Sequence, residues 1–349
     1  MRTALVEISE SHDECIYSQV KFLNDAGVAV DLILNKRLEQ QIDLYKHLCN
    51  SVYFVTPVKK SVFKKFRQQL QLLKILKIYD LLVYNTASSS KMVRNLTFLL
   101  LFSKVKCFGV LHNGRKLTSS FTQKIISLKI KHYFVLSDSI VKNISSQSDV
   151  SLSSFYPIYF PKFKQSIVKP KGEIWITIPG RIDWLRRDYE ILISALAKAK
   201  RLNSIKFLFL GKLDKDSKQG QQLWAHIKAH RLERYFITFD SFISNEDYHN
   251  ILMATDYVMP LLKTDESYLK YKISGSLNLA YAHHKILLCK RYFEPLNDLR
   301  ENGVFYNEGD LSNVLQKIND NSLVRPKGYL DQKWSCTYQQ SRYLSFLGC

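Results

Sequence analysis

The sequence predicts an α/β protein made of two doubly wound parallel sheets that are joined by one irregular connection. Short runs rich in β-branched and aromatic residues alternate with helical stretches in both halves of the chain. This alternation fails between residues 151 and 171 and then starts again. At 349 residues the chain also exceeds the size at which one hydrophobic core stops growing, so two domains are expected.

Six apolar runs of the first half are expected to be strands. They cover residues 3–8, 28–34, 51–55, 80–84, 105–111 and 132–136. A helix is expected between the first two, over residues 12–26, because Gly27 behind it suits a left-handed helix cap. Strands that alternate with helices favour a parallel sheet with right-handed crossovers.

The second half repeats the pattern with strands expected at 174–178, 205–210, 235–238, 256–261, 285–289 and 303–306, and an amphipathic helix at 189–201. We therefore expect four segments. They are an N-terminal Rossmann-like domain (1–155), a linker (156–172), a C-terminal Rossmann-like domain (173–325) and a helical segment (326–349) that packs back toward the N-terminal domain. Two such domains are expected to face a central cleft, with ligands at the carboxyl ends of the strands.

The net charge of +20 indicates an anionic partner, and it is unevenly distributed. Residues 1–170 hold 25 Lys and Arg against 11 Asp and Glu, and the excess is concentrated in residues 59–77, where lysines interleave with apolar residues. This basic amphipathic pattern is typical of a helix on an anionic membrane surface. The alternative is an ordinary surface helix whose apolar stripe packs in the core. No nucleic acid is expected as a partner, because no nucleic-acid motif is present.

The sequence favours a cytoplasmic protein that is peripheral at the inner face of the cell membrane. The six cysteines are scattered without a C-x-x-C motif, and the amino terminus is too polar for an export signal. The most apolar run, residues 96–102, is far shorter than the roughly 20 residues that a spanning helix needs.

Two loops of the second half have the chemistry of an anion site, although both the dinucleotide fingerprint and the P-loop are missing. In the first, Ser274, Gly275 and Ser276 open a helix and offer backbone N–H groups and the positive end of its dipole, with Lys272 close by. The alternative is plain capping by Ser274, with Lys272 solvated.

The second loop follows the strand at 174–178. Gly180 permits a turn, and Arg181 together with Arg186 or Arg187 could bind a diphosphate as planar forks. The competing interpretation pairs these arginines with neighbouring carboxylates such as Asp183 on a surface turn.

Polar candidates for the cleft lie in the loops of the first half. His112 leaves the carboxyl end of the strand at 105–111 and could reach the cleft, with Asn113 in the turn behind it. His12 and Asp13 lie in the loop after the first strand and could hold a hydroxyl-rich acceptor. His112 is alternatively a structural histidine, and His12 and Asp13 alternatively cap the first helix.

No metal and no cofactor are expected. Asp214 and Asp216 resemble a D-x-D cation motif but have no third ligand nearby. His283 and His284 are adjacent and lack the spacing of zinc ligands.

Together the loop at His112, the Gly180-Arg181 turn and the helix start at Gly275 resemble a GT-B fold glycosyltransferase. The chain looks most like the retaining family-4-type enzymes that build bacterial surface polysaccharides such as capsule or O-antigen. The resemblance implies that Arg181, Arg186 and the segment from Ser274 to Ser276 hold the donor diphosphate. Where that family commonly has two glutamates, this sequence has Lys270 and Asn278. In this respect it is similar to a polysaccharide-assembly subgroup in which a lysine and a serine precede the helix.

The resulting hypothesis is metal-independent transfer of a hexosyl or pentosyl group from a nucleotide-diphospho-sugar to a lipid-linked or oligosaccharide acceptor. Arg181, Lys272 and His112 would be catalytic, and His12, Asp13 and Asn113 would line the acceptor side. Two alternatives remain open. The chain could be a non-catalytic GT-B partner subunit of another transferase, or a basic nucleic-acid-binding protein.

Overall fold

The computed structural model describes residues 1–58, 61–88, 90–147 and 149–349, and the chain divides into two compact units. Unit 1 contains Met1–Pro161, Ser267–Ile273 and Gln332–Cys349, and unit 2 contains Lys162–Glu266 and Ser274–Asp331. The chain thus leaves unit 1 at Pro161, inside the segment expected to be a linker. It returns to unit 1 for the seven residues before Ser274 and again for its C-terminal segment.

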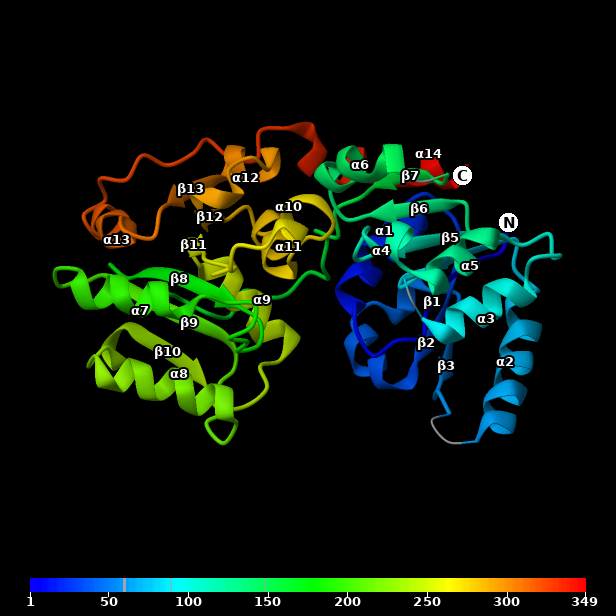
Figure 1. Ribbon diagram of the computed structural model, residues 1–349, viewed down its shortest axis with the longest axis horizontal. Coiled ribbons are helices and arrows are strands. Elements are labelled where there is room, and N and C mark those ends of the chain that lie inside the picture. The colour runs from blue at the N-terminus through cyan, green and yellow to red at the C-terminus, as the bar shows by residue number, and fades with distance from the viewer. Residues whose placement is uncertain (59–60, 89, 148) are drawn as a thin grey trace. The chain divides into compact units, whose positions relative to one another are not determined.

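Unit 1 is built on a seven-stranded parallel sheet in the order β3-β2-β1-β4-β5-β6-β7 (Figure 1). The strands are β1 (Thr3–Glu7), β2 (Val30–Asn35), β3 (Ser51–Val55), β4 (Leu81–Tyr84), β5 (Lys106–Leu111), β6 (His132–Val135) and β7 (Ser151–Ser154). Strand order reverses between β1 and β4. In doubly wound folds such a reversal marks the ligand crevice, so the carboxyl ends of these two strands are here called the crevice of unit 1.

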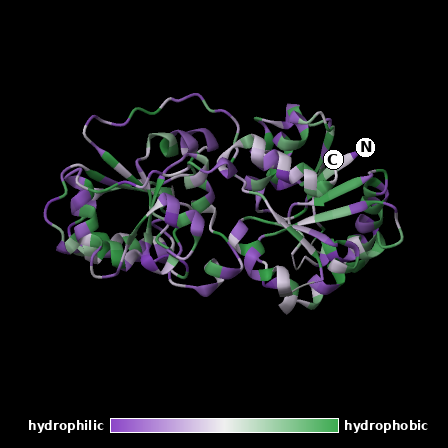
Figure 2. Ribbon diagram, turned by 90° about the horizontal axis from the view of Figure 1, so that it is seen from above, coloured by the Kyte–Doolittle hydropathy of each residue, from purple (hydrophilic) through white to green (hydrophobic). Residues whose placement is uncertain are grey.

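Helices cover both faces of this sheet. They are α1 (Ile16–Asp25), α2 (Val62–Leu76), α3 (Lys91–Leu99), α4 (Lys116–Ser119), α5 (Phe121–Lys129), α6 (Asp138–Ile144) and α14 (Cys336–Leu347). Alternate residues of β1 enter different cores: Ala4 and Val6 pack with α2, α3 and α5, whereas Leu5 packs with α1 and α14. Figure 2 shows hydrophobic residues along the strands, as expected for a sheet that is buried on both faces.

The C-terminal helix α14 completes the layer beside α1. Tyr343 is fully buried, and its ring stacks on that of Phe134 with centroids 4.6 Å apart. Gln340 Nε2 donates a hydrogen bond to the carbonyl oxygen of Phe22 in α1. The last helix in the sequence is therefore part of the core of unit 1.

Unit 2 repeats the arrangement with a six-stranded parallel sheet in the order β10-β9-β8-β11-β12-β13. The strands are β8 (Ile174–Pro179), β9 (Ile205–Lys212), β10 (Phe236–Phe239), β11 (Tyr257–Val258), β12 (Ile286–Lys290) and β13 (Gly303–Tyr306). Its helices are α7 (Tyr189–Lys198), α8 (Lys218–Ala229), α9 (Asn245–Ala254), α11 (Gly275–Ala282), α12 (Asn297–Asn302) and α13 (Leu311–Asn319). The short α10 (Glu266–Lys270) begins on the last unit 2 residue before the chain returns to unit 1. The order of strands reverses between β8 and β11.

The expected strands all occur, with two differences from the sequence prediction. Ser151–Ser154, placed in the irregular region by the sequence, forms the edge strand β7 because β6 offers it a pairing partner. The strand expected at 256–261 shrinks to Tyr257–Val258, since the chain turns away at Pro260, which cannot donate to a ladder. None of the helices in the described residues combines the length and apolarity needed to cross a bilayer.

Candidate functional site

The two crevices of the sheets are where ligands bind in doubly wound folds, and the candidate residues lie at them. In unit 1 the last residue of β1 is the buried carboxylate Glu7. Its Oε1 accepts a hydrogen bond from Ser9 N at 2.7 Å, and its Oε2 accepts from Asn85 Nδ2 at 2.7 Å and Thr86 Oγ1 at 2.6 Å. Glu7 therefore joins the ends of β1 and β4.

Asn85 connects this carboxylate to both predicted histidines. Its Nδ2 also donates to the carbonyl oxygen of His12 at 2.8 Å, and its own carbonyl oxygen lies 2.8 Å from His112 Nε2. Since a carbonyl oxygen only accepts, Nε2 of His112 carries the proton. Behind Asn85, Gln19 Nε2 donates to Asn85 Oδ1 at 2.7 Å, and Tyr343 of α14 donates to Gln19 Oε1 at 3.0 Å.

The structure brings His12 and His112 together. Their rings stack with centroids 3.5 Å apart and an interplanar angle of 12°, and His12 adopts a left-handed backbone with φ of 70°. His12 Nδ1 lies 3.3 Å from Glu14 Oε1. No side chain caps the 3-10 turn Asp13–Cys15 or the start of α1, so His12 and Asp13 do not act as helix caps.

Burial and charge set the two imidazoles apart. Burial, helped by the nearby His12, lowers the pKa of His112 to about 4. Burial also acts to lower the pKa of His12, but the hydrogen bond and negative charge of Glu14 outweigh it and raise that pKa. The pKa of Asp13 is raised to about 6 by burial and by the charge of Glu14. Three neighbouring groups of different acidity result: His112 is neutral, His12 favours its protonated form, and Asp13 is a weak acid. Such a group is suited to proton transfer.

Asn113 and Lys272 both lie in unit 1. Asn113 Oδ1 accepts from Arg115 N at 3.1 Å and so shapes the turn. Lys272 lies in the segment Ser267–Ile273 of unit 1, with Nζ 4.1 Å from the centroid of the Tyr268 ring. This segment joins the loop after β5, because Gly114 N donates to the carbonyl oxygen of Tyr271 at 2.8 Å.

In unit 2 the predicted arginines lie at the carboxyl end of β8. Arg181 and Arg186 are exposed and share Asp183, whose Oδ2 lies 3.8 Å from Arg181 Nη2 and 3.5 Å from Arg186 Nε. The turn needs Gly180, whose φ is +97°. The pairing with Asp183 proposed as the competing interpretation is present, but it is loose and leaves two cations on one anion.

Arg187, the next residue, has a structural position. It is buried, and its guanidinium donates to the carbonyl oxygens of Pro260, at 2.7 Å, and of Pro179. Nη2 also lies 3.4 Å from Ser276 Oγ, which in turn donates to the Pro179 carbonyl at 3.2 Å. One side chain thus holds together the ends of β8 and β11 and the start of α11.

The start of α11 keeps the character of an anion site. Ser274 is the residue that precedes the helix, and it makes no side-chain cap, so the capping alternative is absent here. At Gly275 a Cβ atom would meet nothing within 4 Å, so open space adjoins this backbone. The hydroxyl of Ser276 is engaged with Pro179, which leaves backbone N–H groups as the donors of this turn.

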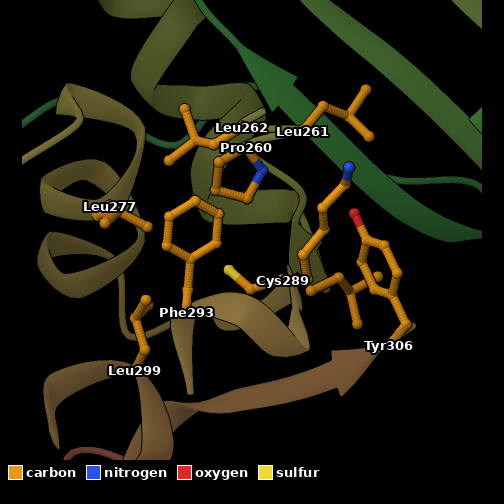
Figure 3. A pocket seen from close by; sticks show the side chains of 10 residues that line it. Pro260, Leu261, Leu262, Leu277, Cys289, Phe293, Leu299 and Tyr306 are labelled. Carbon is orange, nitrogen blue, oxygen red and sulfur yellow. The ribbon is translucent and has the colours of Figure 1, made fainter. Parts of the chain in front are cut away.

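Near this edge, unit 2 also contains a buried cation and a narrow pocket that the sequence did not reveal. Lys290 Nζ lies 2.6 Å from Asp188 Oδ2 and 3.1 Å from Glu308 Oε1. Burial acts to lower the pKa of Lys290, but the hydrogen bonds to these two carboxylates outweigh it and raise the pKa. Figure 3 shows the pocket, which is mostly apolar and is lined by Pro260, Leu261, Leu262, Leu277, Leu288, Cys289, Lys290, Phe293, Leu299 and Tyr306.

The side chains of Asp214 and His283 have hydrogen-bond partners in unit 2. Asp214 Oδ1 accepts a hydrogen bond from Asp216 N at 3.2 Å, and His283 Nε2 lies 2.9 Å from Nδ1 of His249. Over the described ranges, no group of three or more His, Cys, Asp or Glu side chains is arranged to hold a metal ion.

The fold is similar to that of known nucleotide-sugar proteins, although no family model and no curated protein matches the sequence. Anabaena HepE in complex with UDP superimposes with a TM-score of 0.66 at 12% identity, covering 100% of this chain and 98% of that one. A glycosyltransferase from Rickettsia africae gives 0.65 at 13% identity, covering 99% and 94%. The UDP-GlcNAc 2-epimerase from Methanocaldococcus jannaschii gives 0.65 at 9% identity, covering 100% and 99%. The predicted GT-B fold, with two Rossmann-like domains, is therefore confirmed.

Proposed function

We propose that this protein transfers a sugar from a nucleotide-diphospho-sugar to a hydroxyl of a lipid-linked or oligosaccharide acceptor in the assembly of a cell-surface polysaccharide. The observation that carries the proposal is the pair of exposed guanidinium groups, Arg181 and Arg186, which share the carboxylate of Asp183 at the crevice of unit 2. The net positive charge left there fits a diphosphate, which arginine forks bind in a bidentate manner. The likeness to HepE, whose structures hold UDP and UDP-glucose, supports this ligand class.

The two units have separate roles in the proposed reaction. The bond from the anomeric carbon to the diphosphate breaks, the acceptor oxygen bonds to that carbon, and the hydroxyl proton moves to a base. Arg181, Arg186 and the N–H groups at the start of α11 stabilise the departing diphosphate without a metal. Asp13, whose pKa of about 6 is close to neutrality, takes the proton beside His12.

The first test is binding of UDP, GDP, CDP and ADP by isothermal titration calorimetry. The double variant Arg181→Ala/Arg186→Ala is expected to weaken binding of the preferred nucleotide roughly 10- to 150-fold, the range for one charged hydrogen bond, or more if both are lost. The matched control is Arg201→Ala. Arg201 is exposed and precedes β9, at the amino ends of the strands and so away from the crevice. Unchanged binding in the double variant would contradict the site, and no nucleotide binding by the unaltered protein would favour a non-catalytic subunit.

The second test identifies the product, because the epimerase neighbour and the acid–base group in unit 1 also suit isomerisation of the sugar. Proton NMR of a reaction with the preferred nucleotide-sugar distinguishes a new glycoside from an isomerised nucleotide-sugar. Transfer is expected, with retention of the anomeric configuration and without loss of rate in a metal chelator. An isomerised sugar formed without an acceptor would overturn transfer.

A further inference from the structure

The first two turns of α2 take no part in the reaction proposed above, yet they have an unusual surface. Every residue from Ser61 to Arg67, here called the α2 tip, is exposed. Three of them are apolar, namely Val62, Phe63 and Phe66, and three are basic, namely Lys64, Lys65 and Arg67. In Figure 1, α2 lies beside α3.

The apolar stripe of α2 continues beyond the core that it serves. Leu73, Leu70, Phe66 and Phe63 follow one another at helical spacing on one face. Their exposed fractions rise from 9% at Leu73 to 38%, 54% and finally 76% at Phe63. The C-terminal half of the helix therefore matches the expected surface helix with its stripe in the core, whereas the N-terminal half leaves the same stripe uncovered.

The tip is a hydrogen-bonded helix that is tied to the preceding segment. Ser61 Oγ accepts a hydrogen bond from Lys64 N at 3.4 Å. Gln68 accepts from Val58 N at 3.1 Å and donates to the Thr56 carbonyl at 2.8 Å. The exposed phenylalanines therefore project from an anchored scaffold.

The tip belongs to a long stretch of chain whose charges are almost all positive. Residues 44–137 contain 17 Lys and Arg and a single acidic residue, Asp80, which accounts for a surplus of 16 out of the total of +20. Asp80 itself accepts a hydrogen bond from Arg2 N at 2.7 Å. Lys59 and Lys60, which the sequence also placed in this basic segment, lie outside the described residues.

We propose that the α2 tip docks unit 1 on an anionic lipid bilayer. Phe63 and Phe66 enter the boundary between headgroups and acyl chains, while Lys64, Lys65 and Arg67 lie among the anionic headgroups. A nucleic acid would neutralise the cations and could stack on the phenylalanines, but it would leave the aliphatic side chain of Val62, which is 83% exposed, in contact with water. The inference goes beyond the proposed transfer and does not depend on it, because binding to lipid is measured without substrate.

The test is flotation of the full chain with phosphatidylcholine vesicles that contain or lack phosphatidylglycerol. Lys64→Gln/Lys65→Gln is expected to weaken partitioning onto the anionic vesicles roughly 30-fold, at about fivefold per lysine. Phe63→Ser/Phe66→Ser is expected to weaken it at least roughly tenfold, because the variant loses buried aromatic area. The controls are Lys198→Gln/Lys200→Gln and Phe242→Ser in unit 2, which remove the same charge and an equally exposed phenylalanine and are expected to change nothing.

The four substituted positions of the tip, 63 to 66, are all exposed. Thermal unfolding and nucleotide binding of these variants should therefore match those of the unaltered protein. Binding to neutral and anionic vesicles alike would overturn the proposal, as would anionic binding that both tip variants retain. Binding to single-stranded DNA that the tip variants lose, without binding to vesicles, would assign the tip to nucleic acid instead. Partitioning is also expected to fall as salt screens the lysines.

Discussion

Arg186 and Arg187 are adjacent, yet Arg186 is exposed at the proposed diphosphate site and Arg187 is buried and structural. Replacing each by lysine in turn should therefore lower nucleotide affinity in one variant and stability in the other. Lysine keeps the charge of Arg187 but cannot reach the carbonyl oxygens of both Pro179 and Pro260, which the guanidinium fork joins. Losing one charge-assisted hydrogen bond in a buried place costs about 1.5–3 kcal/mol. For a unit of this size each kcal/mol lowers the midpoint of unfolding by about 2–4 °C, so Arg187→Lys should lower it by about 3–12 °C.

Tryptophan fluorescence during urea and thermal unfolding measures this effect in the right place, because Trp175, Trp184 and Trp224 belong to unit 2 and only Trp334 to unit 1. Arg186→Lys is the paired variant. Its ion pair with Asp183 is exposed and loose, so its free energy of unfolding should change by less than about 0.5 kcal/mol while its nucleotide affinity falls. Equal destabilisation by the two substitutions would refute this division of roles.

Three further outcomes follow from unit 1. Gly109→Ala should lower the free energy of unfolding in urea by about 1–3 kcal/mol, since the new Cβ would lie 2.4 Å from Ala87 Cβ. A smaller loss would mean that the backbone at Ala87 shifts to make room for the new methyl group. Tyr343→Phe should cost about 1 kcal/mol, because Gln19 Oε1 loses its buried donor, and the exposed Tyr338→Phe is the control, with no measurable change. The folded pKa of His112, about 4, lies below its unfolded value of 6.5, so its share of stability is present at neutral pH and is lost as the pH falls from about 6.5 to 4. His112→Gln should flatten that slope in unfolding curves taken across this pH range, and an unchanged slope would contradict the shift.

The fold could be predicted from the sequence because the strands of a parallel sheet that is buried on both faces appear as continuous apolar runs. The lack of such a run explains the one strand that was not predicted. Ser151–Ser154 has one apolar residue, so its strand conformation comes from pairing with β6 and leaves no local signal. Pro260 acts in the opposite direction, because it interrupts an apolar run that would otherwise extend β11.

The site was accessible only where its chemistry is local. The Gly180 turn with Arg181 and Arg186 could be predicted, because each feature lies within one loop. The network around Glu7 could not be, since its partner Asn85 is 78 residues away and Tyr343 lies 324 residues from Gln19. Nor can a sequence decide between adjacent arginines, because the path of the turn determines that Arg187 points inward and Arg186 does not.

The distribution of charge within unit 1 bears on which unit holds the donor. Unit 1 carries most of the excess positive charge, yet its crevice contains Glu7 and Glu14, with Asp13 beside them. Carboxylates repel a diphosphate but suit hydroxyl groups and their protons, whereas the crevice of unit 2 has the exposed guanidinium groups. Most basic residues of unit 1 belong to the stretch 44–137, which contains α2. The residues proposed to attract an anionic membrane are therefore different from those proposed to act on the substrate. The substitution Asp13→Lys, which reverses the charge at this position, should therefore leave nucleotide affinity unchanged while abolishing transfer. A gain in nucleotide affinity would show that the donor binds to unit 1.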